Sequence, residues 1–312
     1  MKLEAIEKMV IAGAGIMGAS IAQILVQNGY SVVLYDIEER FLEKGRELID
    51  INQQTLIAAG DFTPEQSRKN MSHIFFTCDK TCFSGADFVI EAIVENMEAK
   101  HGFWSEVSQL APPDAILTSN TSGLSLTEIA KAVRNPERFA GMHWVNPPHL
   151  VPLIEVIKGE KTSEETAQLV YYLSLRIGKK PVMVNKDAAG FILNRIQFAV
   201  LREAMHIVDS GIASLEDVDN VFKYGMGMRY ACLGPFEIAD LGGLDIFYKI
   251  SGYLFKELNS SGEVSRLLED AYNSGNFGVK SGKGFYDYSG GRDKEIIKKR
   301  DENFIKFLRC FE

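Results

Sequence analysis

The sequence predicts an α/β protein, in which a doubly wound parallel sheet is followed by a smaller, mainly α-helical domain. In the first half of the chain short apolar runs alternate with segments of helical spacing, whereas from Ala189 onward helical spacing alone remains. Alternating strands and helices are typical of a parallel sheet that is covered on both faces. We therefore expect a sheet domain at residues 1–188, a helical domain at 189–290 and an amphipathic helical tail at 291–312.

The N-terminal segment predicts a strand, a glycine-rich turn, a helix and a second strand in direct succession. Met9–Ala12 and Ser31–Tyr35 are short apolar runs, and Ile16–Gln27 between them has helical spacing. The turn Gly-Ala-Gly-Ile-Met-Gly at 13–18 joins the first strand to the helix, and Asp36 follows the second strand. A G-x-G-x-x-G turn in this order of elements is typical of a dinucleotide site in a Rossmann-type sheet.

The residues of this segment have distinct roles in binding a dinucleotide. Gly13 permits the tight turn, Gly15 lets the backbone approach the pyrophosphate, and Gly18 allows close packing of helix and strand. Asp36 accepts hydrogen bonds from the adenosine ribose and repels a 2′-phosphate, which favours NAD over NADP. We expect the phosphates to rest on the amides of the turn and of the helix start, at Gly13, Gly15, Ile16, Met17 and Gly18.

The rest of the first half continues the alternating pattern. Asp87–Glu91 and Ala115–Thr118 are predicted strands, and the long segment Asp36–Lys69 has helical spacing around Phe41–Leu56. Ser119–Ser122 follows a predicted strand directly. Because an open α/β sheet binds ligands at the carboxyl ends of its strands, we expect these polar residues to face a ligand.

Composition and charge exclude several classes of function. The net charge of −8 argues against a nucleic-acid partner, which needs a concentrated basic surface. Four cysteines form no disulfide framework, and Cys78 and Cys82 are too sparse for a zinc site, so we expect no metal and a reduced, cytoplasmic setting. Met9–Tyr35 lacks charged residues, but glycines interrupt it, and we therefore expect no membrane span.

A histidine and a carboxylate lie on two further predicted strands. Phe139–Trp144 carries His143, Leu153–Ile157 carries Glu155, and a proline-rich turn separates the two strands. Adjacent strands would place the imidazole beside the carboxylate, so that Glu155 orients His143 as a general base. A satisfied core histidine is the alternative interpretation. Together with a dinucleotide, a base is the minimum equipment of an alcohol dehydrogenase.

These motifs resemble those of the L-3-hydroxyacyl-CoA dehydrogenase family. The resemblance extends from about Met9 to Tyr288, and its motifs are the glycine-rich turn, Ile90–Asn96, Ser119–Ser122, His143–Pro148, Leu153–Ile157, Ala189–Arg195 and Lys283–Tyr286. The resemblance implies NAD as the cofactor and oxidation of an L-3-hydroxyacyl group, as in 3-hydroxybutyryl-CoA, to a 3-ketoacyl group. It also implies a homodimer that forms through the helical domain, residues 189–290.

The resemblance assigns roles to individual residues. His143 corresponds to the catalytic base and Glu155 to its partner, while Ser122 and Asn194 correspond to the residues that hold the substrate oxygen. The positions that contact NAD correspond to Asp36, Glu95, Lys100, Ser122 and Asn146. Asn194 also lies on the apolar stripe of a helix predicted from about Ala189 to Val208, where an unpartnered amide costs free energy. An interface or helix-bonding asparagine is the alternative interpretation of Asn194.

Two departures from the family pattern leave the substrate class open. Glu47–Ser67 contains no Lys or Arg, whereas the acyl-CoA enzymes of the family carry basic residues in this region. Gly225–Ala231 resembles the L-gulonate 3-dehydrogenase (lambda-crystallin) branch, and Arg229 within it could bind a free carboxylate or be a surface arginine. A CoA thioester and a free 3-hydroxy acid such as L-gulonate both remain candidate substrates.

A noncatalytic NAD-binding or structural protein is an interpretation from a different class. The lambda-crystallin resemblance shows that such a scaffold can serve a structural role. Its weakness here is that the base, its carboxylate partner and the two oxygen-holding residues are all present in this sequence.

Overall fold

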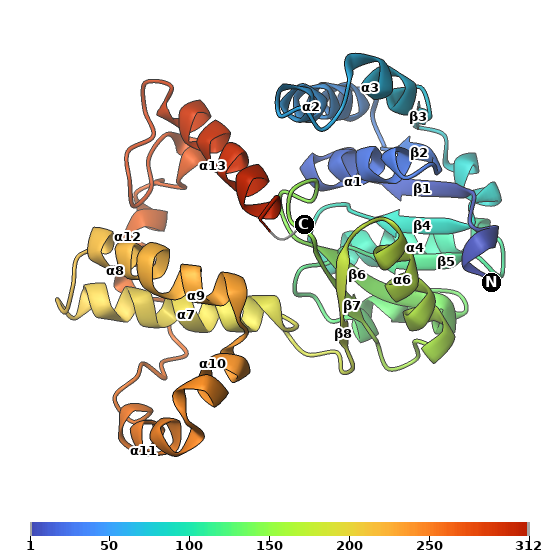
Figure 1. Cartoon of the computed structure of the whole chain (residues 1–312). Helices are drawn as coiled ribbons and strands as arrows, with labels where there is room; N and C mark the ends of the chain where they lie inside the picture. Colours follow the sequence, from blue (N-terminus) through green and yellow to red (C-terminus); the bar gives the residue numbers. More distant parts are fainter. Residues whose placement is uncertain (1, 311–312) are drawn as a thin grey trace. The chain divides into compact units, whose positions relative to one another are not determined.

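The structure is a computed structural model that describes residues 2–310 of the 312-residue chain. The chain forms two compact units, of which the first comprises residues 1–195 and 299–312 and the second comprises residues 196–298 (Figure 1). This division assigns most of the C-terminal tail to the first unit. The domain bounds expected from the sequence, with a boundary between 188 and 189, stay a prediction.

Eight strands among the described residues form one sheet in the first unit, in the order β3-β2-β1-β4-β5-β6-β7-β8. Neighbouring strands are parallel, except that β6 and β7 are antiparallel. The strand order reverses between β1 and β4, and the carboxyl ends of strands at such a reversal frame the ligand crevice of an open α/β sheet. The strands are β1 (Lys8–Ala12), β2 (Ser31–Tyr35), β3 (Ile74–Thr77), β4 (Phe88–Glu91), β5 (Ile116–Ser119), β6 (Phe139–Trp144), β7 (Leu153–Ile157) and β8 (Lys180–Val184).

Helices cover both faces of this sheet, which confirms the predicted doubly wound fold. One buried cluster packs α1 and α6 against the sheet through Leu25 and Leu173, and a second packs α4 and α5 through Trp104 and Ile129. The helices are α1 (Ile16–Gln27), α2 (Glu39–Ala58), α3 (Pro64–Met71), α4 (Met97–Leu110), α5 (Leu126–Ile129) and α6 (Glu164–Arg176), with 3₁₀ turns at Leu3–Ala5, Lys80–Gly85, Ala130–Ala132 and Pro136–Arg138.

The second unit is built from helices. Met205 and Ile238 are its two buried residues, and every residue of this unit is described. Ser214 caps α8 by accepting a hydrogen bond from the Asp217 amide. Its helices are α8 (Leu215–Val221), a π-helical turn Phe222–Met226, α9 (Gly227–Cys232), α10 (Pro235–Gly242), α11 (Leu244–Leu254), α12 (Arg266–Asn273) and a 3₁₀ turn Val279–Ser281. Two further helices belong to both units: α7 (Leu193–Asp209) begins in the first unit, and α13 (Arg292–Leu308) continues into it after residue 298.

Some elements differ from the sequence-based expectations. Helix α7 begins at Leu193 rather than near Ala189, because Gly190 and Phe191 have left-handed φ values of 77° and 51° that a right-handed helix cannot include. Strands β3 and β8 were not predicted. The predicted tail helix is α13, and residues 311–312 of the predicted tail lie outside the described residues.

Two structural features are absent from residues 2–310. No helix in this part of the chain is long and apolar enough to cross a membrane. Nor does this part contain three or more His, Cys, Asp or Glu side chains that are placed to hold one metal ion.

Candidate active site

The three glycines of the turn after β1 meet different surroundings: Gly13 and Gly18 are closely packed, and Gly15 faces open space. A Cβ at Gly13 would lie 2.5 Å from the Ala92 carbonyl oxygen, and a Cβ at Gly18 would lie 1.8 Å from the Gly13 carbonyl oxygen. At Gly15, in contrast, no atom lies within 4 Å of an added Cβ. Gly15 is also the N-cap of α1, whose first amides form a site for an anion. The turn therefore fits a pyrophosphate at the start of α1.

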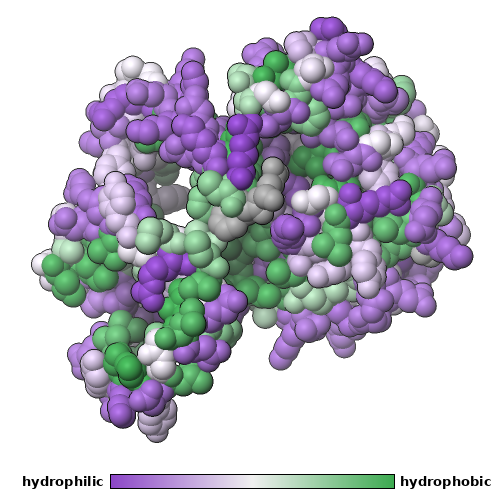
Figure 2. All heavy atoms as spheres, viewed as in Figure 1, coloured by the Kyte–Doolittle hydropathy of each residue, from purple (hydrophilic) through white to green (hydrophobic). Residues whose placement is uncertain are grey.

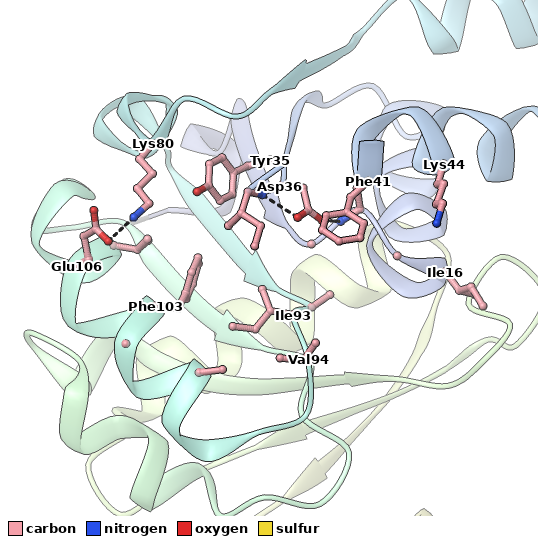
Figure 3. A pocket seen from close by; sticks show the side chains of 18 of the residues that line it. Ile16, Tyr35, Asp36, Phe41, Lys44, Lys80, Ile93, Val94, Phe103 and Glu106 are labelled. Carbon is pink, nitrogen blue, oxygen red and sulfur yellow. Dashed lines mark hydrogen bonds and ion pairs between the residues drawn. The ribbon is translucent and has the colours of Figure 1, made fainter. Parts of the chain in front are cut away.

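A cavity of about 770 Å³ adjoins this turn (Figure 3). The end of β2 contributes Tyr35 and Asp36, and α2 contributes Phe41 and Lys44. The opposite wall comes from the segment after β4 and from α4, including Phe103. Mostly apolar walls with a few polar groups are typical of a cofactor site. The position beside the phosphate turn and Asp36 fits the adenosine half of NAD.

Asp36 braces the turn and also faces this cavity. Its Oδ2 accepts a hydrogen bond from the Ala14 amide at 2.7 Å, and its Oδ1 accepts one from the Ile37 amide at 2.7 Å. A carboxylate has about four acceptor sites, so two remain for ribose hydroxyls. Arg40, a cation near Asp36 in the sequence, pairs with Glu38 at 2.8 Å. The charge at this position therefore favours NAD over NADP.

His143 and Glu155 lie opposite each other on the antiparallel strands β6 and β7. The Nδ1 atom of His143 donates a hydrogen bond to Glu155 Oε2 over 2.7 Å, and both side chains are buried. Since an ionised carboxylate only accepts hydrogen bonds, the proton of the neutral imidazole resides on Nδ1. Nε2 is therefore the nitrogen that can accept a proton.

Glu155 also caps the start of α7. Its Oε1 accepts hydrogen bonds from the Ile192 amide at 2.8 Å and the Leu193 amide at 2.9 Å. The left-handed turn at Phe191 precedes these amides, and the Phe191 ring packs 5.7 Å from the His143 ring. Glu155 thus positions both the His143 imidazole and the start of α7, the helix that carries Asn194.

These hydrogen bonds control the charge of Glu155. Burial acts to raise the pKa of the Glu155 carboxyl, but the bonds from His143 and from the two amides outweigh burial and hold the pKa below its usual range. Glu155 is consequently ionised at neutral pH. A fixed negative charge in this position stabilises an imidazolium that forms during proton transfer.

Ser122, in the loop after β5, is held through its backbone. Its amide donates to Glu95 Oε1 at 2.8 Å, and its carbonyl oxygen accepts from Asn194 Nδ2 at 2.6 Å. The same Glu95 oxygen accepts the Thr121 hydroxyl at 2.6 Å. Among the described residues none forms a hydrogen bond with the Ser122 hydroxyl. The structure therefore brings Ser122 and Asn194 together, as the sequence-based interpretation requires.

Glu95 is bound in turn to a buried lysine. The Nζ atom of Lys100 lies 3.2 Å from Glu95 Oε2 and 2.5 Å from Glu91 Oε1, and the Lys100 side chain is 1% exposed. Burial acts to raise the pKa of Glu95, but hydrogen bonds from Thr121 and Ser122 and the charge of Lys100 hold it below its usual range. Because carboxylates enclose Lys100, a direct contact of Lys100 with NAD stays a prediction.

Two predicted site residues lie outside this network. Asn146 is exposed in the turn after β6, and Arg229 is exposed in α9 of the second unit. Their roles stay predictions.

Glu91 shapes the site but was not predicted as a site residue. It is a buried carboxylate at the end of β4, and the signal that could have identified it is a charged residue at the end of an apolar run. Asn120, in the segment Ser119–Ser122 that was expected to face a ligand, instead accepts the Trp144 amide at 2.8 Å through its side-chain oxygen.

Comparison with known proteins gives two family matches that together span most of the chain. The model for the NAD-binding domain of 3-hydroxyacyl-CoA dehydrogenase matches residues 8–188, and the model for the C-terminal domain of the same family matches residues 190–288. The human mitochondrial hydroxyacyl-coenzyme A dehydrogenase is 35% identical over 294 residues, which cover 91% of each chain. The 3-hydroxybutyryl-CoA dehydrogenase of Clostridioides difficile is 34% identical over 283 residues, 90% of this chain and 99% of that protein.

A relative with a different substrate matches over a longer part of the chain. The 5-formyl-3-hydroxy-2-methylpyridine 4-carboxylate 5-dehydrogenase of Mesorhizobium japonicum is 35% identical over 308 residues, 98% of this chain and 99% of that protein. A crystal structure of a dehydrogenase for this pyridine acid, described as an NAD⁺-dependent dismutase, matches with a TM-score of 0.91 over 98% of both chains. A coverage of 98% includes most of the tail that follows residue 288.

Proposed function

The chain belongs to the 3-hydroxyacyl-CoA dehydrogenase family, and we propose that His143 is the general base of its reaction. Members of this family are NAD-dependent oxidoreductases that act on a CH–OH group, and this chain is one of them. The observation that carries the proposal is the buried pair in which Glu155 accepts the Nδ1 proton of His143 at 2.7 Å. This pair leaves Nε2 as the nitrogen that can accept the proton of the substrate hydroxyl.

The proposed mechanism assigns one task to each residue. When bound, NAD would provide the acceptor for the hydride that leaves the substrate. His143 Nε2 takes the hydroxyl proton, and the charge of Glu155 stabilises the imidazolium. The Ser122 hydroxyl and the Asn194 side chain, which the structure brings together, are proposed to hold the substrate oxygen as it becomes a carbonyl.

The turn and the cavity supply the proposed NAD contacts. Backbone amides of the glycine-rich turn and of the α1 start would hold the pyrophosphate, and Asp36 would hold the adenosine ribose. Lys44 also lines the cavity, and we propose that its cation lies near the phosphates. Glu95 and Asn146 are proposed to contact the other half of the cofactor, as the family resemblance implies.

Two substrate classes are compatible with this chemistry. The family membership favours an L-3-hydroxyacyl-CoA, which the enzyme would oxidise to the 3-ketoacyl-CoA. A free hydroxy or formyl carboxylic acid is the second candidate, and two observations favour it. The α2–α3 segment Glu47–Ser67 contains no Lys or Arg for CoA phosphates, and the relative that matches over most of the tail acts on a pyridine carboxylate.

The test is NADH formation by the whole protein with four compounds. These are 3-hydroxybutyryl-CoA, free 3-hydroxybutyrate, L-gulonate and the pyridine acid named above. Turnover of the thioester alone supports the acyl-CoA assignment, whereas turnover of a free acid alone supports the carboxylate assignment. For a free acid, Arg229→Lys tests whether the guanidinium binds the carboxylate, because lysine keeps the charge but loses the bidentate geometry. An NAD-binding protein that turns over none of the four would favour the noncatalytic interpretation.

We also propose that the chain forms a homodimer through residues 189–290. The second unit buries only Met205 and Ile238 among its fully described residues, while Phe236, Leu241 and Tyr248 are 86%, 76% and 82% exposed. Large apolar surfaces of this kind mark protein interfaces. A second copy of the same helical unit is the partner that the family resemblance implies.

A further inference from the structure

Glu91 lies at the point where three parts of the proposed site meet. It is the last residue of β4, and it pairs in register with Ala12 of β1, before the glycine-rich turn, and with Ser119 of β5. Its carbonyl oxygen accepts the Asn120 amide at 2.7 Å. The side chain is fully buried, and nothing in the proposed proton transfer uses it.

Both oxygens of the Glu91 carboxylate are bound. Oε1 accepts Lys100 Nζ at 2.5 Å and the Ile93 amide at 3.1 Å, and Oε2 accepts the Ser119 hydroxyl at 2.6 Å. These partners hold the carboxylate in one position, because any other orientation would leave a charge without a partner in the protein interior.

The contacts of Glu91 and Glu95 form a closed ring. Ser119 binds Glu91, Glu91 binds Lys100, and Lys100 reaches Glu95. Glu95 Oε1 accepts the Ser122 amide, and Ser122 lies in the loop that follows Ser119, the last residue of β5. The ring therefore ties Ser122 in this loop to the end of the strand that precedes it.

The division of charge within the ring explains why two carboxylates are present. Lys100 lies closer to Glu91, at 2.5 Å, than to Glu95, at 3.2 Å. With the ammonium compensated by Glu91, the other oxygen of Glu95 can bind the loop amide. If Glu91 lost its charge, Lys100 would have Glu95 as its one carboxylate partner within the ring, and the attraction would draw Glu95 away from the loop.

We infer that Glu91 is a positioning residue, which keeps Glu95 on the Ser122 amide and thereby keeps the Ser122 hydroxyl directed at the reacting oxygen. The inference rests on the proposed function for the role of the Ser122 hydroxyl. The part that concerns the loop itself depends on the ring of contacts alone.

The first experiment measures the loop without any substrate. Hydrogen exchange of the Ser122 amide is compared between the full-length protein and Glu91→Gln, which keeps the shape of the side chain and removes its charge. We expect exchange at this amide to accelerate on the order of tenfold, a change that corresponds to about 1.4 kcal/mol. Glu164→Gln, which removes an exposed partner of Lys158, is the matched control and should leave this amide unchanged.

Two outcomes would overturn the inference. One is unchanged exchange of the Ser122 amide in Glu91→Gln, and the other is an acceleration spread evenly over the whole first unit, which indicates lost stability alone. Should Glu91→Gln not fold, Ser119→Ala opens the ring at Glu91 Oε2 without changing any charge. This variant should accelerate the same amide by a smaller factor, and an unchanged rate would then count against the inference.

The second experiment uses kinetics to separate positioning from general damage. At saturating NAD and substrate, Glu91→Gln should lower kcat by about tenfold in the wild-type background but by less than about twofold in Ser122→Ala, because the two changes act through one hydroxyl. Effects that multiply would overturn the inference. If the wild-type protein oxidises none of the test compounds, the proposed function fails, whereas the exchange result still decides the role of Glu91 in the loop.

Discussion

The two units of this chain differ in how they are stabilised. In the first unit both faces of the sheet are packed against helices, and residues such as Trp104 and Trp144 are fully buried. In the second unit, of which every residue is described, only Met205 and Ile238 are buried. The first unit has a core of its own, whereas the second has helices whose apolar faces lack a covering layer. The contrast supports the proposed homodimer, in which a second copy of the chain would cover these faces.

The surface of the second unit makes this contrast visible. Figure 2 shows green, apolar side chains gathered over α10 and α11. Exposed residues in these helices include Phe236, Leu241, Leu244, Tyr248 and Tyr253. A monomer that left all of them in water would forgo about 1.5–3 kcal/mol for each large apolar side chain.

The largest expected effect tests whether the chemistry belongs to the first unit. His143→Gln should lower kcat by about three orders of magnitude, because it removes the proton acceptor of the reaction. The Kd for NAD, measured by titration, should change by less than about twofold, and the oligomeric state should not change. Turnover equal to that of the wild type would show that another group is the base.

A substitution on the apolar helices tests whether the second unit forms the proposed dimer interface. Tyr248→Glu introduces a charge into the proposed interface and should weaken the dimer by at least about 100-fold in Kd, as measured by sedimentation. Tyr172→Glu is the matched control, because Tyr172 is also an exposed tyrosine but lies on α6 of the first unit. Dissociation by the control as well, or by neither variant, would contradict an interface at residues 189–290.

The stability of the first unit can be followed separately, because both tryptophans of the sequence lie in it. Glu155→Gln should lower the free energy of unfolding reported by tryptophan fluorescence by about 2–3 kcal/mol at neutral pH, since a buried carboxylate with three hydrogen bonds loses its charge. Hydrogen exchange of amides in helices α8 to α12 of the second unit provides the comparison. An equal loss in both signals would mean that the two units unfold as one.

The pH dependence of this difference has a defined sign. The pKa of Glu155 is lowered in the folded protein, so its contribution to stability is present above the unfolded pKa of about 4.3 and is lost as the pH falls through the lower folded pKa. The gap between wild type and Glu155→Gln should therefore be widest near neutral pH and should shrink on acidification below about pH 4. A gap that widens in acid would refute the assignment of a stabilising charge to Glu155.

The smallest expected effect concerns the tail. Arg309→Ala removes an exposed contact with Asp61 and with the Ala59 carbonyl oxygen, and it should change the stability of the first unit by less than about 1 kcal/mol. Arg40→Ala removes another exposed ion pair and is its control. A loss of several kcal/mol in Arg309→Ala would mean that the tail is part of the core of the first unit.

The sequence was most informative where structure depends on neighbouring residues. The strand, turn and helix around the glycine-rich segment could be predicted because each follows from local spacing and from glycine geometry. The pairing of His143 with Glu155 could be predicted because two short strands joined by a turn tend to lie side by side. The cofactor and the family followed from these same local motifs.

The remaining features depend on contacts between distant segments. The start of α7 was misplaced because Phe191 takes a left-handed conformation in which its ring packs on His143, and this packing is invisible to helical spacing. The Glu91–Lys100 pair joins a strand end to the next helix, and no periodic pattern specifies which cation a buried carboxylate binds. Whether Arg229 reaches the substrate was likewise beyond the reach of the sequence.

The position of Glu155 limits how this protein can be recombined with its relatives. Its carboxylate is bonded to an imidazole on β6 and to the amides of Ile192 and Leu193, so a crossover between residues 156 and 191 separates parts that must fit each other. A hybrid with a foreign helical unit would keep an oriented base only if the donor segment presents two amides after a left-handed turn. Breakpoints after residue 195 keep Glu155 and both amides in the same parent sequence. Libraries of hybrids with such breakpoints should therefore contain more active members than libraries with breakpoints between residues 156 and 191.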